Sequence, residues 1–289
     1  MDNIILYGKN GAYQFCPFDK SNVIGEGGMG RVFKGIDNRG NPVAIKAIFA
    51  ELVNKPSIKE RGELEAHLQF QHPNLIEMLD FCVSEAGRLH IVSRYVAGKS
   101  FPKYMSSFNS SSFDKTVIIV RHIQSVLDAL HFLHQKGIYH RDVKPDNIMI
   151  TTADNAVLMD LGVARASNGK RLTNAGVVIG TPHYSAPEQI KGENNKINAT
   201  TDIYATGITL YEMLTGNPPF DGSSQYDVME MQVKNTIPYN HSLSSEMYKV
   251  LKKATEKEQY KRYQTALEFK SALEQAIKKP IPWWKKLFN

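Results

Sequence analysis

Residues 24–32, IGEGGMGRV, contain glycines in the pattern G-x-G-x-x-G, which two unrelated kinds of chemistry use. Such a loop can hold a dinucleotide at the start of a helix, or it can lie over the phosphates of ATP. It can also be a flexible turn that binds nothing, because glycine readily adopts the positive φ of tight turns. The residues that follow the loop decide between these three interpretations.

The composition is that of a folded globular chain. Hydrophobic residues make up 42% and charged residues 22% of the 289 positions, and no run of about 18 apolar residues predicts a membrane span. Two cysteines, Cys16 and Cys82, exclude a disulfide framework and favour a reducing compartment. The first residues, MDNIILYGKNG, lack the basic segment of a signal peptide, so we expect a cytoplasmic location.

The hydrophobic pattern changes at a serine-rich patch, residues 106–112. Before this patch, short β-branched runs separated by turn residues predict a small antiparallel sheet, with strands around residues 32–33, 43–45 and 89–92 and a helix at 57–71. After it, apolar residues recur at helical spacing from Ile123 to Leu133, and further helices are predicted at residues 202–215, 224–234, 244–255 and 265–278. The fold class is therefore α+β, with a β-rich lobe, a helical lobe and a ligand cleft between them.

The chain after the glycine loop argues against a dinucleotide site. A dinucleotide-binding loop leads directly into a helix, with an acidic residue about 20 positions further on. Here Gly30 is followed by a predicted strand, a turn at residues 37–42 and a second strand that carries Lys46. The loop is therefore predicted to be the tip of a β-hairpin. A lysine on a strand is commonly a solvated edge residue, but beside such a hairpin it becomes a candidate phosphate ligand.

Five motifs occur in one order along the chain. The glycine loop is followed by V-A-I-K at residues 43–46, H-R-D-V-K-P-D-N at 140–147, D-L-G at 160–162 and A-P-E at 186–188. Together they resemble the protein kinase signature, and the segments GEGGMGRV, HRDVKPDNIMI and GTPHYSAPEQI resemble bacterial Hanks-type serine/threonine kinases. The resemblance covers about residues 21–278. It implies the bilobal protein kinase fold, with a small β-rich N-lobe containing one main helix and a larger helical C-lobe.

This resemblance implies roles for the residues of the motifs. Lys46 would bind the α- and β-phosphates of ATP, and Asp142 would orient or accept the proton of the attacking hydroxyl. Asn147 and Asp160 would hold Mg²⁺, in whose place Mn²⁺ could bind. Lys144 would contact the γ-phosphate, as in serine/threonine-specific kinases, and Thr181 would contact the catalytic aspartate.

The same resemblance implies the nucleotide site. A glutamate of the N-lobe helix would hold Lys46, and among Glu60, Glu63 and Glu65 the distance to His72-Pro73 favours Glu63. The residues expected around ATP are Ile24, Gly25, Glu26, Gly27, Gly28, Met29, Gly30, Val32, Ala44, Lys46, Glu63, Arg94, Val96 and Met149.

Other residues are expected to support or regulate the site. Asp202 would brace the catalytic loop, Arg262 would pair with Glu188, and His140 would be structural. Arg141, beside the catalytic aspartate, predicts a kinase regulated by a phosphate on its activation loop, with Thr173 as the phosphorylated residue. His131 and His134 are interpreted as surface or packing residues.

The hinge departs from the family pattern I-V-M-E-Y. Residues 91–95 read I-V-S-R-Y, so Ser93 occupies the gatekeeper position and Arg94 replaces an acid. A small gatekeeper should leave space behind the adenine for bulky purine-like inhibitors. Glu258-Gln259 stands where Asp-Pro is usual, which puts only the local turn in doubt.

The expected organisation is an N-terminal extension packing on the N-lobe (1–20), the N-lobe (21–96), the hinge and C-lobe (97–278) and a tail (279–289). Tail residues Trp283, Trp284, Lys285 and Lys286 could make weak contact with a membrane interface, giving a peripheral location. Many related kinases continue into a membrane span and a sensor, whereas this sequence ends before one.

Proteins carrying Ser or Thr are the expected partners, including the chain itself through autophosphorylation. The net charge of +6 does not indicate a nucleic-acid ligand, because the basic residues are scattered instead of striped. Two alternatives stay open. The intact set Lys46, Asp142, Asn147 and Asp160 argues against a pseudokinase scaffold, and the segment GTPHYSAPE argues against a small-molecule kinase of related fold.

Overall fold

The computed structural model of the chain describes residues 3–27, 30–49, 70–107, 112–160 and 182–278. Several expectations lie outside these ranges: the helix at 57–71 (apart from its last two residues), Gly28, Met29, Glu63, Thr173, Thr181 and the tail 279–289.

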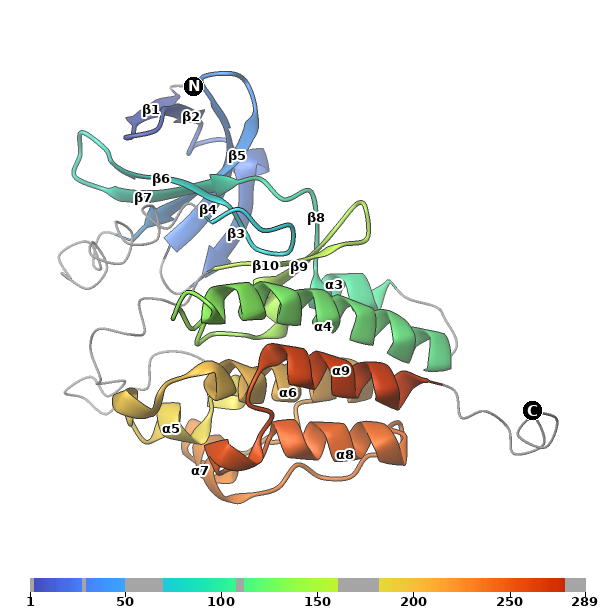
Figure 1. The fold of residues 1–289 in the computed structure, drawn as a ribbon. Helices are drawn as coiled ribbons and strands as arrows, with labels where there is room; N and C mark the ends of the chain where they lie inside the picture. Colours follow the sequence, from blue (N-terminus) through green and yellow to red (C-terminus); the bar gives the residue numbers. More distant parts are fainter. Residues whose placement is uncertain (1–2, 28–29, 50–69, 108–111, 161–181, 279–289) are drawn as a thin grey trace.

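The described part of the N-lobe is an antiparallel sheet in the order β1-β2-β4-β5-β7-β6, with β3 paired to β4 (Figure 1). Its strands are β1 (Ile4–Tyr7), β2 (Ala12–Phe15), β3 (Val23–Gly27), β4 (Gly30–Asp37), β5 (Pro42–Ile48), β6 (Met78–Val83) and β7 (Leu89–Arg94). Buried residues of β2, β4, β5 and β7, among them Phe15, Phe33, Ile45 and Val92, fill one apolar cluster. The three strands expected from the sequence are confirmed, and β1, β2 and β6 were not predicted.

The first hairpin belongs to this sheet. β1 pairs with β2, β2 pairs with β4, and β1 also contacts β6 at the far end of the strand order. Residues 4–15 therefore continue the N-lobe sheet and curve it toward closure.

The C-lobe consists mainly of helices that pack around α4 and α6 (Figure 1). Its described helices are α3 (Phe101–Ser106), α4 (Ser112–His134), α5 (Pro187–Ile190), α6 (Ala199–Thr215), α7 (Gln225–Lys234), α8 (Ser245–Ala254) and α9 (Ala266–Ile277). A small sheet of β8 (Gly98–Ser100), β9 (Ile148–Thr151) and β10 (Ala156–Leu158) lies beside the interlobe boundary. The helices expected from apolar spacing are confirmed; α6 begins earlier than expected because Asn198 caps it, accepting a hydrogen bond from the Thr200 amide at 2.8 Å.

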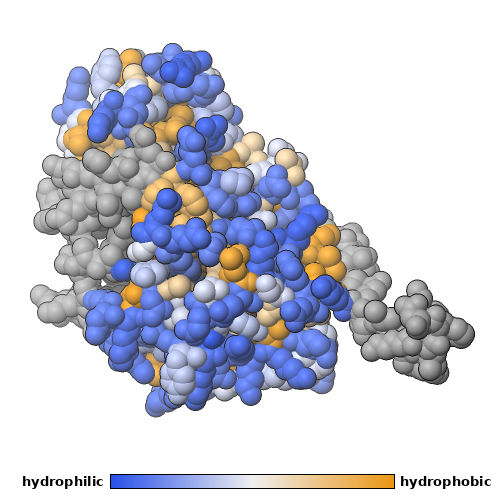
Figure 2. All heavy atoms as spheres, viewed as in Figure 1, coloured by the Kyte–Doolittle hydropathy of each residue, from blue (hydrophilic) through white to orange (hydrophobic). Residues whose placement is uncertain are grey.

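Within α4, residues 115–134 form the one described helix that is long and apolar enough to cross a membrane. Length and composition alone are weak support for a span, because the core helix of a globular domain meets the same criteria. Ile119, Ile123 and Leu127 of this helix are fully buried in the C-lobe core. We therefore assign α4 to the core of the C-lobe. On the face shown in Figure 2, the surface is mostly hydrophilic, with separate hydrophobic spots.

Two features join the lobes. The amide of Ile76 donates to the carbonyl of Leu158 at 2.9 Å, and the amide of Leu158 donates to the carbonyl of Asn74 at 2.8 Å. An apolar cluster that includes Ile48 and Ile91 of the N-lobe and Val157 of β10 lies at the same boundary. This boundary between the lobes therefore carries both main-chain hydrogen bonds and buried apolar surface, which hold the lobes in register.

Candidate active site

The loop at residues 140–147 is held by a carboxylate of α6. Asp202 is fully buried, and its side chain accepts hydrogen bonds from the amides of His140 at 2.8 Å and Arg141 at 2.7 Å. Burial raises the pKa of Asp202, but the hydrogen bond and charge of His134, followed by the charge of His140 and the Arg141 amide, outweigh it and leave that pKa below its ordinary value. Arg141 has a φ of 65°, a conformation that costs free energy and is sustained here by these two bonds.

His134 has a more specific place than the sequence suggested. Its Nε2 lies 2.8 Å from Asp202 Oδ2, so the end of α4 and the start of α6 meet at this carboxylate. His140 is buried and its Nε2 contacts the Met159 carbonyl at 2.9 Å, which agrees with the structural role expected for it.

Asp142 sits within a set of polar side chains from its own loop. Asn147 Nδ2 donates to Asp142 Oδ2 at 3.0 Å and to the Asp142 carbonyl at 2.8 Å. Lys144 Nζ lies 3.3 Å from Asp142 Oδ2. The short turn of residues 145–147 brings Asn147 back toward Asp142, and the buried Val143 fixes the loop to the core. An aspartate held in this way can orient a hydroxyl and take its proton.

Lys46 and Asp160 meet across the lobes. Lys46 Nζ on β5 lies 3.0 Å from Asp160 Oδ2, which follows β10. The amide of Met159 donates to the carbonyl of Asn147 at 2.8 Å, so Asp160 emerges next to the asparagine of the catalytic loop. The side chain of Asp160 is 52% exposed, which leaves it accessible to a ligand. Asp160 has a φ of 47°, another strained position at the site.

The oxygen donors fit a magnesium ion. Asn147 donates through its Nδ2, and within the described ranges no hydrogen bond occupies its amide oxygen. No group of three or more His, Cys, Asp or Glu residues suited to a metal occurs in the part of the chain that the structure describes. Mg²⁺ characteristically takes only one or two protein ligands and completes its shell with water and phosphate, so Asn147 and Asp160 match it.

The glycine loop forms the predicted hairpin. Gly27 at the end of β3 is opposite Gly30 at the start of β4, and Val32 is opposite Lys46 of β5. A Cβ on Gly30 would lie 2.1 Å from the Ala47 carbonyl oxygen, so the close strand contact at this position requires glycine.

The remaining nucleotide-site candidates lie around this hairpin and the hinge. Ile24 is 43% exposed and Gly25 half-buried on β3, and Glu26 is exposed and paired with Arg31 at 2.9 Å. Ala44 is buried on β5, Met149 is half-buried on β9, and Val96 packs against the interlobe cluster. Arg94 is turned to Glu77, with its Nε 2.6 Å from Glu77 Oε2, so its side chain is engaged by the N-lobe.

Residues 182–189 contact the loop at residues 140–147 through Gln189. Gln189 Nε2 donates to the Arg141 carbonyl at 2.9 Å, while its Oε1 accepts from the Ala186 amide at 3.1 Å. Glu188 and Arg262 form the expected buried pair, joined by two hydrogen bonds of 2.9 Å. Burial raises the pKa of Glu188, but Arg262 outweighs it and leaves that pKa below its ordinary value.

Sequence reasoning missed Gln189, the Asp202 contact of His134, and Gln232 of α7. Glutamine has no pattern that marks it as a positioning residue, and the contacts of Gln189 and His134 depend on residues 48 and 68 positions away.

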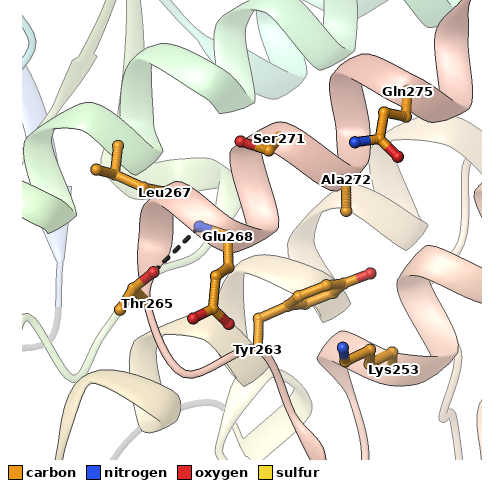
Figure 3. A pocket seen from close by; sticks show the side chains of 8 residues that line it. All are labelled: Lys253, Tyr263, Thr265, Leu267, Glu268, Ser271, Ala272 and Gln275. Carbon is orange, nitrogen blue, oxygen red and sulfur yellow. Dashed lines mark hydrogen bonds between the residues drawn. The ribbon is translucent and has the colours of Figure 1, made fainter.

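A separate hollow of about 540 Å³ lies on the C-lobe between α8 and α9, away from these residues (Figure 3). Lys253 Nζ lies 4.5 Å above the ring of Tyr263, and Tyr263 stacks on Phe269. This arrangement packs α9 against α8, and none of the expected site residues lines the hollow.

A two-lobed fold with a glycine hairpin, a lysine–aspartate contact between lobes and an Asp–Asn catalytic loop defines the protein kinase class. The family model described as "Protein kinase domain" matches residues 18–278. The chain belongs to this family, whose members use ATP and a divalent metal and act on protein substrates.

Curated relatives are bacterial serine/threonine kinases. The chain is 35% identical to serine/threonine-protein kinase PknB of Mycobacterium tuberculosis over 89% of its own length and 42% of that protein. It is 33% identical to a probable serine/threonine-protein kinase of Streptomyces coelicolor over 92% of its length and 40% of that protein. The chain therefore spans about two fifths of these relatives. Among solved structures, the kinase domain of Mycobacterium tuberculosis PknI aligns with a TM-score of 0.66 at 22% identity, covering 88% of this chain and 94% of that one, which supports the fold alone.

Proposed function

We propose that this chain transfers the γ-phosphoryl group of ATP to serine or threonine hydroxyls of proteins. The observation that carries the proposal is the 3.0 Å contact between Lys46 of the N-lobe and Asp160 of the C-lobe, beside the hydrogen-bonded set of Asp142, Lys144 and Asn147. Phosphoryl transfer needs charge neutralisation and positioning more than covalent chemistry, and these residues supply both.

Nucleotide binding would use the hairpin and the interlobe surface. The backbone of the glycine loop can approach phosphates closely, and Lys46 supplies a positive charge below it. Ala44, Val96 and Met149 offer apolar contacts to a base. Arg94 would contribute through its main chain, because its side chain is bound to Glu77.

Asp142 would bind the substrate hydroxyl and accept its proton, while Lys144 would stabilise negative charge on the transferred group. Asn147 and Asp160 would hold Mg²⁺, or Mn²⁺ in its place, and the bound ion neutralises charge on the phosphate oxygens. Glu63 and Thr181 are proposed to support Lys46 and Asp142. Arg141 and Thr173 are proposed as the regulatory pair, with autophosphorylation supplying the phosphate.

The organisation into N-terminal extension, N-lobe, C-lobe and tail is likewise proposed for the full chain. Weak membrane contact through Trp283 and Trp284 would make the location peripheral in the cytoplasm. Vesicle co-sedimentation of the chain with and without residues 280–289 tests it, and equal sedimentation of the two forms would contradict it.

The function is tested with purified chain, radiolabelled ATP, Mg²⁺ and a generic basic protein. Asp142→Asn should reduce incorporation of label at least about a hundredfold, since removal of a general base costs roughly that factor or more. Glu258→Gln is the control, because Glu258 is an exposed carboxylate paired only with Lys261 and Tyr260 on the far C-lobe. Phosphoamino-acid analysis should find phosphoserine or phosphothreonine.

Equal incorporation by wild type and Asp142→Asn, with both proteins folded, would contradict catalysis by this loop and favour a scaffold. Label transferred only to a small molecule would support the small-molecule kinase instead.

A further inference from the structure

A buried series of hydrogen bonds connects α6 and α7 with the short turn of residues 182–184 in the C-lobe. Gln232 of α7 is fully buried; its Oε1 accepts a hydrogen bond from the Tyr204 hydroxyl of α6 at 2.6 Å. The Tyr204 hydroxyl in turn accepts from Lys257 Nζ at 2.8 Å. Gln232 Nε2 donates to the main-chain carbonyl of His183. The oxygen and the nitrogen of the Gln232 side-chain amide therefore both have partners, and the series of hydrogen bonds ends at the main-chain carbonyl of His183.

Cations also lie over the aromatic rings that surround these hydrogen bonds. Lys257 Nζ lies 4.7 Å above the ring of Phe220, and the Arg262 guanidinium lies 4.8 Å above the ring of Tyr204. A buried network in which every member has partners is rigid, and removal of one member leaves another unsatisfied in a dry environment. The orientation of the Gln232 amide is thus specified by the groups around it.

The segment that begins at His183 reaches the loop at residues 140–147 through Gln189. His183 belongs to the short turn of residues 182–184, and a few residues later Gln189 donates to the Arg141 carbonyl, next to Asp142. The following residue, Tyr184, donates its hydroxyl to Glu212 Oε2 of α6 at 2.7 Å. Gln232 holds the backbone of this turn at the His183 carbonyl. The His183 side chain is 26% exposed, and its Nε2 lies 3.9 Å from Asp221 Oδ1.

We propose that Gln232 is a positioning residue for the polypeptide substrate: it fixes the main chain at His183, so that residues 182–185 form a rigid edge for the residues beside the phosphorylated hydroxyl. This inference rests on the proposed kinase activity. Gln232 lies in α7, and its side chain bonds to Tyr204 and His183 of the C-lobe, so its loss should affect the peptide and spare the nucleotide.

The test compares steady-state kinetics of wild type and Gln232→Met, a substitution of similar length that removes both hydrogen bonds. The varied substrates are ATP and a synthetic basic peptide with one threonine. The expected result is a KM for the peptide raised about tenfold, equivalent to about 1.4 kcal/mol, with the KM for ATP and peptide-independent ATP hydrolysis within twofold of wild type. Tyr204→Phe keeps the Gln232–His183 bond and should raise the peptide KM by a smaller factor.

Thr209→Val is the matched control. It also removes a buried polar atom from α6, but within the described residues the Thr209 hydroxyl has no hydrogen-bond partner. Its peptide KM should equal that of wild type. A merely structural role for Gln232 would change the KM for ATP and the peptide together, and this result or an unchanged peptide KM overturns the inference. If Gln232→Met does not fold, the test is the smaller rise of the peptide KM in Tyr204→Phe, and an unchanged peptide KM in that variant overturns the inference. A wild type that transfers no phosphate overturns the proposed function instead.

Discussion

Ser93 is the residue at which the candidate nucleotide site departs most from the family pattern. It is half-buried on β7, opposite Ala44 of β5 and Met78 of β6. Serine is much smaller than the methionine of the pattern, so this position places little side-chain volume beside Ala44. The next residue, Arg94, has its side chain on Glu77 Oε2, and its amide donates to the Glu77 carbonyl at 2.9 Å.

Ser93→Met should therefore weaken bulky purine-like inhibitors without comparable loss of ATP binding. A substituent that fills space beside Ser93 would collide with methionine, and we expect its Kd to rise at least about tenfold. The measurement is inhibitor Kd and KM for ATP in both proteins. Ser93→Ala is the control and should bind the inhibitor as wild type does; equal Kd values for wild type and Ser93→Met would mean that this residue does not face the site.

At the scale of elements, the first hairpin depends on one buried carboxylate of β6. Asp80 is 2% exposed and accepts hydrogen bonds from the amides of Lys9 at 3.1 Å, Asn10 at 2.7 Å and Phe81 at 2.9 Å, and from the Tyr13 hydroxyl at 3.2 Å. Burial and the nearby Asp80 carboxylate raise the pKa of Tyr13, so Tyr13 stays a donor. A Cβ on Gly8 would lie 2.2 Å from Asp80 Oδ2, so glycine is needed where the turn crosses the carboxylate.

Asp80→Ala should detach this hairpin. Three amides and a hydroxyl lose their acceptor, and we expect roughly 2–4 kcal/mol of lost stability, concentrated in the N-lobe. Hydrogen exchange of residues 4–15 and chemical unfolding measure the effect. Asp19→Ala is the control, since Asp19 is exposed and, among the described residues, its side chain accepts hydrogen bonds from Ser21 alone. Unchanged exchange in the hairpin would show that pairing with β4 alone retains it.

This hairpin also marks the limit of prediction from the sequence. β4, β5, β7 and the long helices were predictable, because β-branched runs between turn residues mark strands and apolar residues at helical spacing mark helices. The loop at residues 140–147 was recognisable because its residues are contiguous. β1, β2 and β6 are short and depend on Asp80, which is about seventy residues from the amides it binds. The contacts of His134, Gln189 and Gln232 likewise depend on tertiary packing, for which local spacing holds no signal.

At the scale of the whole molecule, each lobe contains buried or half-buried histidines that resist protonation. His72 and His90 of the N-terminal half and His122 and His140 of the C-lobe all have a pKa below the ordinary value, with burial as the largest cause. Protonation of any of them would place a charge in a poorly solvated environment. The folded protein should therefore lose stability in mild acid through groups spread over both lobes.

His90 allows the direction of this change in stability with pH to be tested. Burial lowers its pKa from 6.5 to about 4, and its Nδ1 contacts the Arg88 carbonyl at 3.1 Å. Between pH 6.5 and 4 the unfolded chain binds a proton at this residue that the folded chain does not, so stability falls as the pH falls and is constant in this respect above pH 6.5. By pH 5 the loss from His90 is roughly 2 kcal/mol at most.

The variant His90→Asn keeps a donor for the Arg88 carbonyl and cannot titrate, so it isolates this contribution. Chemical unfolding at pH 7.5 and pH 5 should show a smaller loss of stability for the variant than for wild type, the difference being the His90 contribution, while the other buried histidines act equally in both. Asp19→Ala, which changes an exposed group of the same lobe, should retain the wild-type loss. Parallel pH profiles for wild type and His90→Asn would mean that His90 accepts its proton in the folded lobe, and that the acid sensitivity resides in the other histidines.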